Sequence, residues 1–314
     1  MNKLRVAVLM GGTSSERAVS LMSGARVVAA LDRAQYDVRP VDFTGDVAQI
    51  SALKADTDVV FLALHGPGGE DGRIQGVLDL LGLPYTGSGV LGSALAMHKG
   101  VAKAIYCQAN IPTPRGITLR MSPTTSPGAS AERVRATLGL PCVVKPANEG
   151  STFGVSIVRE IEQLEPALVM AAGFDAEVIV EQFIAGTEIT VPVLGTTRPR
   201  ALPVIEIIPA SGFYDFEMKY TPGATQEVCP ARLSDDVTAR AMDYAVRAHQ
   251  ALCCRGVSRT DMIVAGEVIM VLETNTLPGM TDTSLLPLSA RVAGIAFPAL
   301  LDYLLADALG KEPA

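Results

Sequence analysis

Along the first hundred residues, short apolar runs alternate with longer segments whose apolar side chains recur every three or four positions. The short runs are typical of buried strands, and the longer segments are typical of helices with one face in a core. The predicted strands are residues 4–10, 36–43 and 58–64, and the predicted helices are residues 19–31, 72–81 and 93–109. Strands that alternate with helices favour a parallel sheet covered on both faces. We therefore expect an α/β domain at the start of the chain.

The rest of the chain changes to groups of consecutive strands with fewer helices between them. The predicted strands are residues 115–119, 141–145, 155–158, 177–181, 188–194, 202–208, 259–264 and 268–274, and the predicted helices are residues 164–172 and 235–253. Two polar stretches, 122–130 and 211–230, are predicted as loops. At roughly 150 residues per domain, a chain of 314 residues is expected to hold two domains or three small ones.

The composition indicates the class of protein and its surroundings. Apolar residues make up 48% and charged residues 19%, which excludes a disordered or fibrous protein. No stretch reaches the roughly 18 apolar residues of a membrane span, since the best candidate, 292–309, is interrupted by Pro298, Asp302 and Asp307. The first residues lack a signal-peptide pattern, and the five cysteines include no C-x-x-C pair. We therefore expect a cytoplasmic protein with free thiols and no membrane partner.

The net charge and the glycine-containing turns limit the kinds of ligand that the protein is expected to bind. The 26 Lys and Arg residues against 33 Asp and Glu give a net charge of −7 without a dense basic run, so no nucleic-acid partner is expected. The common phosphate signatures G-x-G-x-x-G and G-x-x-x-x-G-K-[ST] are absent. The glycine-containing turn at 11–15 follows a strand and precedes a helix, but an ordinary connection explains it equally well.

Residues 145–154 form a candidate phosphate loop. Lys145 ends an apolar strand, and a small flexible stretch of Gly150, Ser151 and Thr152 follows it. Glycines let backbone N–H groups approach an anion, and hydroxyl groups add donors. An ordinary hairpin loop remains the alternative for this segment.

Four polar side chains on the last two predicted strands form the sharpest candidate site. Residues two apart on a strand share a face, so Arg259 lies beside Asp261, and Glu273 beside Asn275. Two adjacent strands would thus present three oxygen ligands without His or Cys, which suits a hard cation such as Mg²⁺ or Mn²⁺. The alternative is a hairpin with a solvated polar face and one salt bridge. The neighbouring residues expected to face a core, which disfavour that alternative, are Ile263, Ile269 and Leu272.

These segments, together with others in the same order, resemble the D-alanine–D-alanine ligases of the ATP-grasp superfamily. The resemblance covers nearly the whole chain. The segments that carry it are residues 11–16, 65–72, 83–88, 145–154, 181–188, 213–220, 259–261, 273–280 and 284–285. One departure is His98, which precedes Lys99 where the family usually has an acid, and which is expected to be exposed on a helix.

The resemblance implies an α/β fold with a three-domain ATP-grasp architecture. Its expected parts are a parallel-sheet substrate-binding domain (1–98), a central ATP-grasp domain (99–186) and a C-terminal catalytic domain (187–314), with ATP held between the central and C-terminal sheets. The residues implied to bind ATP are Lys99, Lys145, Gly150, Ser151, Thr152, Glu181, Gln182, Ile184 and Glu188. Those implied to hold two Mg²⁺ or Mn²⁺ ions are Asp261, Glu273 and Asn275.

The implied reaction joins two D-alanine molecules for peptidoglycan precursor synthesis. The γ-phosphoryl group of ATP moves to the carboxylate of the first D-alanine, and the amine of the second attacks the resulting D-alanyl phosphate. The residues implied to serve the first D-alanine and the chemistry are Glu16, His65, Ser151, Lys219, Tyr220 and Arg259. Those implied to receive the second D-alanine are Gly279, Ser284 and Leu285.

Within the catalytic set the implied roles differ. Glu16 would hold the ammonium of the first D-alanine, and Ser151 and Tyr220 would bridge to Glu16 and close the site against water. Lys219 would reach the transferred phosphate, and Arg259 would stabilise the oxyanion of the tetrahedral intermediate. Plainer interpretations stay open: a loop histidine at position 65, a simple partner for the carboxylate at position 261, a helix cap at position 284 and a solvated pair at 219–220.

Three other functions compete with this one. A ligase for a D-lactate or D-serine acceptor shares the fold, but Tyr220, where related D-lactate ligases typically have histidine, favours an amine nucleophile. A nucleotide-binding regulatory protein with a silent site is disfavoured because Glu16, Lys145, Arg259 and the metal set are all present. A nicotinamide-dependent dehydrogenase lacks its dinucleotide signature. The resemblance also implies a homodimer.

Overall fold

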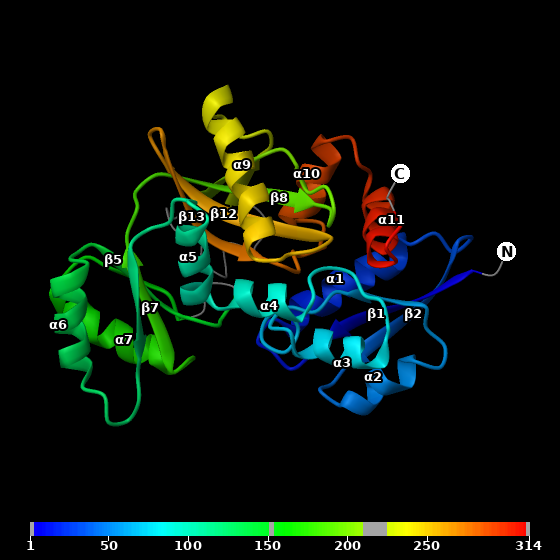
Figure 1. Cartoon of the computed structure of the whole chain (residues 1–314), viewed down its shortest axis with the longest axis horizontal. Helices are drawn as coiled ribbons and strands as arrows, with labels where there is room; N and C mark the ends of the chain where they lie inside the picture. The colour runs from blue at the N-terminus through cyan, green and yellow to red at the C-terminus, as the bar shows by residue number, and fades with distance from the viewer. Residues whose placement is uncertain (1–2, 151–153, 210–224, 312–314) are drawn as a thin grey trace.

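Three β-sheets organise the part of the chain that the structure describes. The protein is described by a computed structural model that covers residues 3–150, 154–209 and 225–311. Figure 1 shows the first sheet (blue) and the second (green) at opposite ends of the long axis, with the third lying between them. A ligand held where the second and third sheets face each other is therefore contacted by strands from two parts of the chain.

The first sheet is parallel, as predicted, with strand order β2-β1-β3. Its strands are β1 (Leu4–Gly11), β2 (Tyr36–Phe43) and β3 (Val59–Leu62). One face packs against α1 (Arg17–Ala30) and α11 (Phe297–Ala308), and the other packs against α2 (Val47–Leu53) and α3 (Arg73–Leu81). Alternate residues of β1 divide between these two cores because successive strand side chains point to opposite faces.

The helix predicted at 93–109 is wrong as a single element. The structure has α4 (Val90–Met97) and α5 (Lys99–Gln108), separated at His98, whose backbone is extended. The ring Nδ1 of His98 accepts a hydrogen bond from the backbone N–H of Val101 at 3.3 Å, and its Nε2 lies 2.7 Å from Oε2 of Glu177. His98 is therefore a helix cap whose partly buried ring contacts Glu177, and not the exposed helix residue that was expected.

The second sheet is antiparallel, in the order β4-β7-β5-β6. Its strands are β4 (Gly116–Arg120), β5 (Cys142–Pro146), β6 (Ser156–Val158) and β7 (Glu177–Gln182). The helices α6 (Pro127–Thr137) and α7 (Leu164–Ala172) cover one face, and a 3₁₀ turn (Ile161–Gln163) precedes α7. The loop predicted at 122–130 is wrong beyond Ser126, which caps α6 and is followed by proline at the first helical position.

The third sheet is also antiparallel, in the order β11-β10-β8-β12-β13, with β9 paired to β8. Its strands are β8 (Thr187–Leu194), β9 (Arg200–Ala201), β10 (Ile205–Pro209), β11 (Thr225–Val228), β12 (Val257–Ala265) and β13 (Val268–Asn275). α5 and α9 (Asp235–Ala251) cover one face, and α10 (Leu285–Val292) packs near β8 and β10. The loop predicted at 211–230 is wrong at β11, and residues 210–224 lie outside the described part of the chain.

A β-bulge interrupts the pairing of β12 with β13. Asp261 pairs with Glu273, but Met262 pairs with Val271, so Leu272 is the extra residue. Of the three apolar residues expected to face a core, Ile269 is buried, whereas Ile263 and Leu272 are only half-buried and line a cleft instead. The bulge places Leu272 and Glu273 on the same side of the sheet, which simple alternation does not predict.

In the described part of the chain, no single helix has the length and apolar character needed to cross a membrane. The helices α10 and α11 meet that test only when taken together, across a bend of 103°.

Candidate active site

Two neighbouring hollows lie where the three sheets approach one another. The intersheet cleft lies between the second and third sheets, and the inner cavity lies between the first sheet and the loops that follow β13. The residues that line both are Lys99, Glu149, Gly150 and Glu273. A group bound in one hollow is therefore adjacent to a group bound in the other.

The intersheet cleft has apolar walls with charged residues at one end. Its apolar lining includes Val143, Ile157, Ile184, Ile207, Ile263 and Leu272. A flat aromatic ring fits such walls, and few convergent polar groups are needed to orient it. The predicted ATP-binding residues that line this cleft are Lys99, Lys145, Gly150, Glu181, Gln182, Ile184 and Glu188. The other two, Ser151 and Thr152, lie outside the described residues.

A buried carboxylate joins two lysines at the charged end of this cleft. Glu181 on β7 accepts from Nζ of Lys145 at 2.6 Å and from Nζ of Lys103 at 2.8 Å. Burial by itself favours the neutral form of Glu181, but the two ammonium groups outweigh it and hold the pKa of the carboxyl below its usual range. Burial lowers the pKa of Lys145, yet Glu181 and Glu273 raise it above its ordinary value, so Lys145 stays charged.

Lys103 is a member of this cluster that the sequence interpretation missed. It lies on α5 and also donates to Oγ1 of Thr113 at 2.7 Å. Burial lowers the pKa of its ammonium. Residues four apart on a helix share a face, so the spacing from Lys99 was a signal that Lys103 points toward the same region. The structure also gives the Glu181 side chain the task of orienting two lysines, besides its expected contact with adenine.

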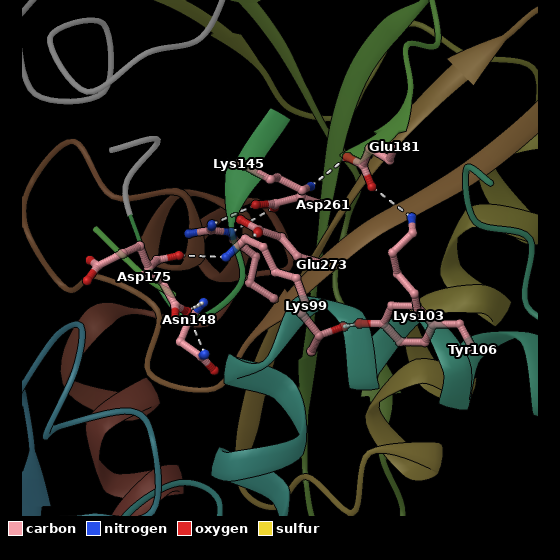
Figure 2. Close-up of polar contacts among 12 residues, drawn as sticks. Lys99, Lys103, Tyr106, Lys145, Asn148, Asp175, Glu181, Asp261 and Glu273 are labelled. Carbon is pink, nitrogen blue, oxygen red and sulfur yellow. Dashed lines mark hydrogen bonds and ion pairs between the residues drawn. The ribbon is translucent and has the colours of Figure 1, made fainter. Parts of the chain in front are cut away.

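Lys99 stands at the boundary of the two hollows. Lys99 is the first residue of α5. Its Nζ donates to the backbone carbonyl of Glu149 at 2.6 Å and lies 3.1 Å from Oε2 of Glu273. Figure 2 shows Lys99 beside the carboxylate of Glu273 and Lys145 beside that of Glu181. The break between α4 and α5 therefore places Lys99 where it borders both the intersheet cleft and the inner cavity.

Hydrogen bonds to Asp175 hold the segment that leads into Gly150. The backbone N–H and side-chain amide of Asn148 both donate to Oδ2 of Asp175, at 3.0 and 2.7 Å. This pair fixes the start of the candidate phosphate loop.

The predicted metal-binding side chains come together on β12 and β13. Asp261 lies opposite Glu273, and Arg259 lies opposite Asn275. Oδ1 of Asp261 accepts from Thr190 at 2.5 Å, and Oδ1 of Asn275 accepts from the N–H of Leu277. Within residues 3–150, 154–209 and 225–311, no group of three or more His, Cys, Asp or Glu side chains is placed to hold a metal ion. A cation here would therefore require the amide oxygen and oxygens from a ligand.

Arg259 pairs with Asp261 and also borders the inner cavity. Its Nε and Nη2 donate to the two carboxylate oxygens of Asp261 at 3.0 and 2.9 Å. The alternative interpretation, in which Arg259 is only a partner for Asp261, therefore describes an observed contact. It is incomplete, because Arg259 also lines the cavity that contains Glu16 and Ser284. The bidentate pair fixes the guanidinium plane at the wall of that cavity.

Glu16 lies deep in the inner cavity, at the start of α1. It is 6% exposed, and two glycine-containing loops approach it closely. A Cβ atom added to Gly150 would lie 2.5 Å from Oε2 of Glu16, and one added to Gly66 would lie 2.8 Å from the same atom. Both distances are below van der Waals contact, so a side chain at either position would have to displace the Glu16 carboxylate from its place.

Burial sets the charge of two other groups in the inner cavity. It lowers the pKa of His65 below its usual range, although the charge of Glu16 opposes this, and Nε2 of His65 lies 3.2 Å from Oγ of Ser23. Burial and then the charge of Glu16 raise the pKa of Glu70 to about 8. Glu70 lies within the segment 65–72 that carries the resemblance, but the sequence indicated no role for it. An acid inside a glycine-rich loop that follows a strand was the available signal.

Ser284 stands just before α10 and faces the inner cavity. Its side chain does not cap the helix; instead its Oγ accepts from the N–H of Thr281 at 2.9 Å and lies 2.8 Å from Oγ1 of Thr281. A Cβ added to Gly279 would meet this Oγ at 2.7 Å. The first N–H groups of a helix attract anions, so Ser284 and the N–H of Leu285 can receive a carboxylate. The remaining predicted residues, Lys219 and Tyr220, lie outside the described part of the chain.

Comparison with known proteins links this geometry to a family. A family model described as the D-ala D-ala ligase C-terminus matches residues 105–306, and one described as the D-ala D-ala ligase N-terminus matches residues 5–52 and 46–88. A D-alanine–D-alanine ligase from Syntrophobacter fumaroxidans is 52% identical over 310 residues, which cover 98% of each chain.

Solved structures agree with this likeness. The D-alanine–D-alanine ligase of Bacillus anthracis complexed with ATP matches with a TM-score of 0.84 at 35% identity, covering 98% of each chain. A D-Ala:D-Ser ligase from Enterococcus faecalis matches with a TM-score of 0.85 at 31% identity, covering 98% of this chain and 100% of that one. The overall fold therefore does not distinguish acceptors.

Proposed function

The chain belongs to the D-alanine–D-alanine ligase family, and we propose that it joins two D-alanine molecules while converting ATP to ADP and phosphate. The observation that carries this proposal is the shared boundary of the two hollows, formed by Lys99, Glu149, Gly150 and Glu273. A nucleotide in the intersheet cleft and an amino acid in the inner cavity would meet at that boundary. This is the arrangement that phosphoryl transfer to a carboxylate requires.

In the intersheet cleft, adenine would lie between the apolar walls, with its edge against the backbone of Gln182 and Ile184. Glu188 would accept from the ribose hydroxyls. Lys145, fixed by Glu181, and Lys99 would contact the phosphates. Because Lys145 is already held in place and charged, it needs no rearrangement when charge moves in the transition state.

The oxygen set of Asp261, Glu273 and Asn275 fits Mg²⁺ or Mn²⁺, because these cations prefer carboxylate and amide oxygens. Two such ions, when bound, would offset the negative charge of the phosphates. The present partners of these carboxylates, Arg259 and Lys99, already offset part of their mutual repulsion.

A carboxylate is a poor electrophile, since it repels nucleophiles and lacks a leaving group. Transfer of the γ-phosphoryl group to the first D-alanine removes both obstacles. Glu16 would hold the ammonium of this molecule and so direct its carboxylate toward Lys99 and the phosphates. His65, neutral because of burial, and Glu70, largely protonated at pH 7, add no further charge beside Glu16.

The second D-alanine would place its carboxylate at Ser284, Gly279 and the N–H of Leu285, with its amine facing the acyl phosphate. Arg259 would stabilise the oxyanion of the tetrahedral intermediate, which then releases phosphate. Pairing with Asp261 keeps the guanidinium in one orientation during this step.

Closure and organisation complete the proposal. Ser151 and Tyr220 would bridge to Glu16, Thr152 would contact the phosphates, and Lys219 would reach the transferred group. The close approach of Gly150 to Glu16 supports such closure, which protects an acyl phosphate from water. We also propose domain limits of 1–98, 99–186 and 187–314, a homodimer and a cytoplasmic location.

Product analysis with defined acceptors tests the function. The protein is incubated with ATP, Mg²⁺ and D-alanine, alone or with D-lactate, D-serine or L-alanine, while phosphate release and products are measured by mass spectrometry. We expect D-alanyl-D-alanine as the main product and little mixed product. Folded protein that releases no phosphate in response to D-alanine would contradict the proposal, and a preferred D-seryl or D-lactyl product would change the acceptor.

A further inference from the structure

An arginine on α1 binds the loop that leads to the acceptor subsite. Nη1 of Arg26 donates to the backbone carbonyls of Met280 and Thr281, at 2.9 and 2.5 Å, and its Nε lies 2.7 Å from Oδ1 of Asp282. Its guanidinium carbon also lies 4.0 Å from the centre of the Phe297 ring. One side chain of the first sheet's helix therefore contacts three successive residues that follow β13.

These contacts continue directly to the acceptor subsite. The carbonyl of Thr281 accepts from Arg26, while the N–H and hydroxyl of the same residue contact Oγ of Ser284. The preceding N–H, that of Met280, donates to Oγ of Ser23 on α1 at 3.2 Å. Thr281 therefore links Arg26 to Ser284, because both side chains form hydrogen bonds with it.

We propose that Arg26 is a positioning residue for the second substrate. By holding the peptide of Thr281, it fixes the orientation of Ser284 and of the first N–H groups of α10 toward the acceptor carboxylate. This inference rests on the proposed function, because it takes Ser284 as part of the acceptor subsite. Arg26 itself does not line the inner cavity.

The same helix also carries the residue assigned to the first substrate. Glu16 immediately precedes α1, and Arg26 lies ten positions further along it, about 15 Å at the rise of a helix. A helix is rigid over this length, so α1 sets the distance between the donor ammonium and the acceptor loop. Small displacements between reacting groups cost large factors in rate, which gives this distance a functional meaning.

Two observations separate this role from simple packing. The contact between α1 and α11 is already made by apolar residues, including Val27 and Leu31, and does not require a guanidinium. The ion pair with Asp282 contributes little, because the Asp282 side chain is 90% exposed. The two carbonyl contacts are therefore the part of the Arg26 environment that distinguishes it from an ordinary surface arginine.

The test compares Arg26→Met with Arg33→Met in the full-length protein. Methionine keeps the apolar stem over Phe297 and removes the donors. Arg33 is a matched control, since it also donates to two backbone carbonyls, those of Val38 and Val28, away from the acceptor loop. Phosphate and dipeptide are measured at saturating ATP over a range of D-alanine concentrations.

Arg26→Met is expected to raise the acceptor KM about tenfold, the loss typical of a charged hydrogen-bond donor. It should also release more than one phosphate per dipeptide at low D-alanine, because water then hydrolyses the acyl phosphate to D-alanine and phosphate. Reduced stability alone would lower both products together and leave their ratio at one. Arg33→Met should keep both the KM and the ratio.

Arg26→Lys serves if Arg26→Met folds poorly. Lysine retains a charged donor, so we expect a smaller rise in acceptor KM, about threefold. An unchanged KM and ratio in the Arg26 variants, or equal changes in Arg33→Met, would overturn the inference. Wild-type protein that makes no dipeptide would instead refute the proposed function, so the two failures are distinguishable.

Discussion

The intersheet cleft and the inner cavity meet at Lys99 but are built differently. The cleft takes its charged groups from strands and α5, and these groups fix one another through ion pairs such as Lys145 with Glu181. The inner cavity shares strand residues such as Arg259 and Glu273, but it takes Glu16, His65 and Ser284 from helix starts and loops, and the backbones at Gly66 and Gly150 approach Glu16 closely. The cleft should therefore be most sensitive to loss of charge, and the cavity most sensitive to added volume.

The largest effect is expected at the boundary of the two sites. Glu273→Gln removes a charge that faces Lys99 and is part of the proposed metal set. Turnover should fall by about 10²–10³-fold, the scale seen when one electrostatic contact to a transition state is lost. Steady-state phosphate release measures this, with circular dichroism to confirm folding. Glu267→Gln, at the exposed β12–β13 turn, is the matched control, and equal rates in the two variants would refute the assignment of Glu273.

A smaller effect is expected from added volume in the inner cavity. Gly66→Ala and Gly68→Ala both place alanine at a positive φ, +71° and +88°, so both should lose about 1–2 kcal/mol of stability. Only the Cβ at Gly66 meets Glu16, whereas nothing lies within 4 Å of a Cβ at Gly68. We expect kcat/KM for D-alanine to fall about 10- to 100-fold in Gly66→Ala alone. Parallel loss in both variants would show that backbone strain, and not the clash, is responsible.

Some elements of the fold could be predicted from the sequence, and others could not. Periodicity predicted the parallel sheet and most strands, and the fold class is confirmed. It failed at His98, because α4 and α5 both carry apolar residues at helical spacing and the break depends on a ring that caps the second helix. It also failed at β11, since a short half-exposed edge strand of polar residues resembles a loop.

The candidate site was predictable where residue type and strand spacing were enough. Asp261 lies opposite Glu273 on the neighbouring strand, and Asn275 lies opposite Arg259, although the bulge at Leu272 was invisible to a two-residue period. Lys103 and Glu70 were missed because their importance comes from burial beside distant charges, which a linear sequence does not display. The assigned roles stay predictions until they are measured.

Loss of Lys103 should weaken the cleft without abolishing it. Lys103→Met leaves Glu181 with Lys145 as its remaining lysine partner. We expect a rise in the KM for ATP of about tenfold and a loss of about 3 kcal/mol in stability, because a buried charge loses a partner. ATP titration of turnover and urea unfolding measure the two effects. Lys54→Met, on the exposed surface, is the control, and an unchanged KM would limit Lys103 to a structural role.

The smallest effect on activity is expected outside both sites, in the core between α9 and β12. His249 is buried, its Nδ1 lies 2.8 Å from Oγ of Ser258, and burial lowers its pKa from 6.5 to about 4. The stability that depends on keeping His249 neutral is fully present above pH 6.5. It is lost as pH falls toward 4, because the histidine then binds a proton in the unfolded chain but not in the folded protein. The loss is at most about 3 kcal/mol.

Unfolding by urea between pH 7 and 4.5 tests this contribution. His249→Gln, which cannot be protonated but can still bond Ser258, should show a shallower fall in stability than the wild type. Identical slopes would show that other groups govern the acid response. Activity at pH 7 should be unchanged, since His249 lines neither hollow.

The position of α11 has a consequence for how the protein is made. Together with α1, this helix covers one apolar face of the first sheet, and the chain makes it long after the strands of that sheet (Figure 1). During translation the part of that face that lies under α11 stays uncovered until residues 297–308 have left the ribosome. Chains that stop before residue 297 would expose it to water, which makes them candidates for aggregation and for recognition by chaperones.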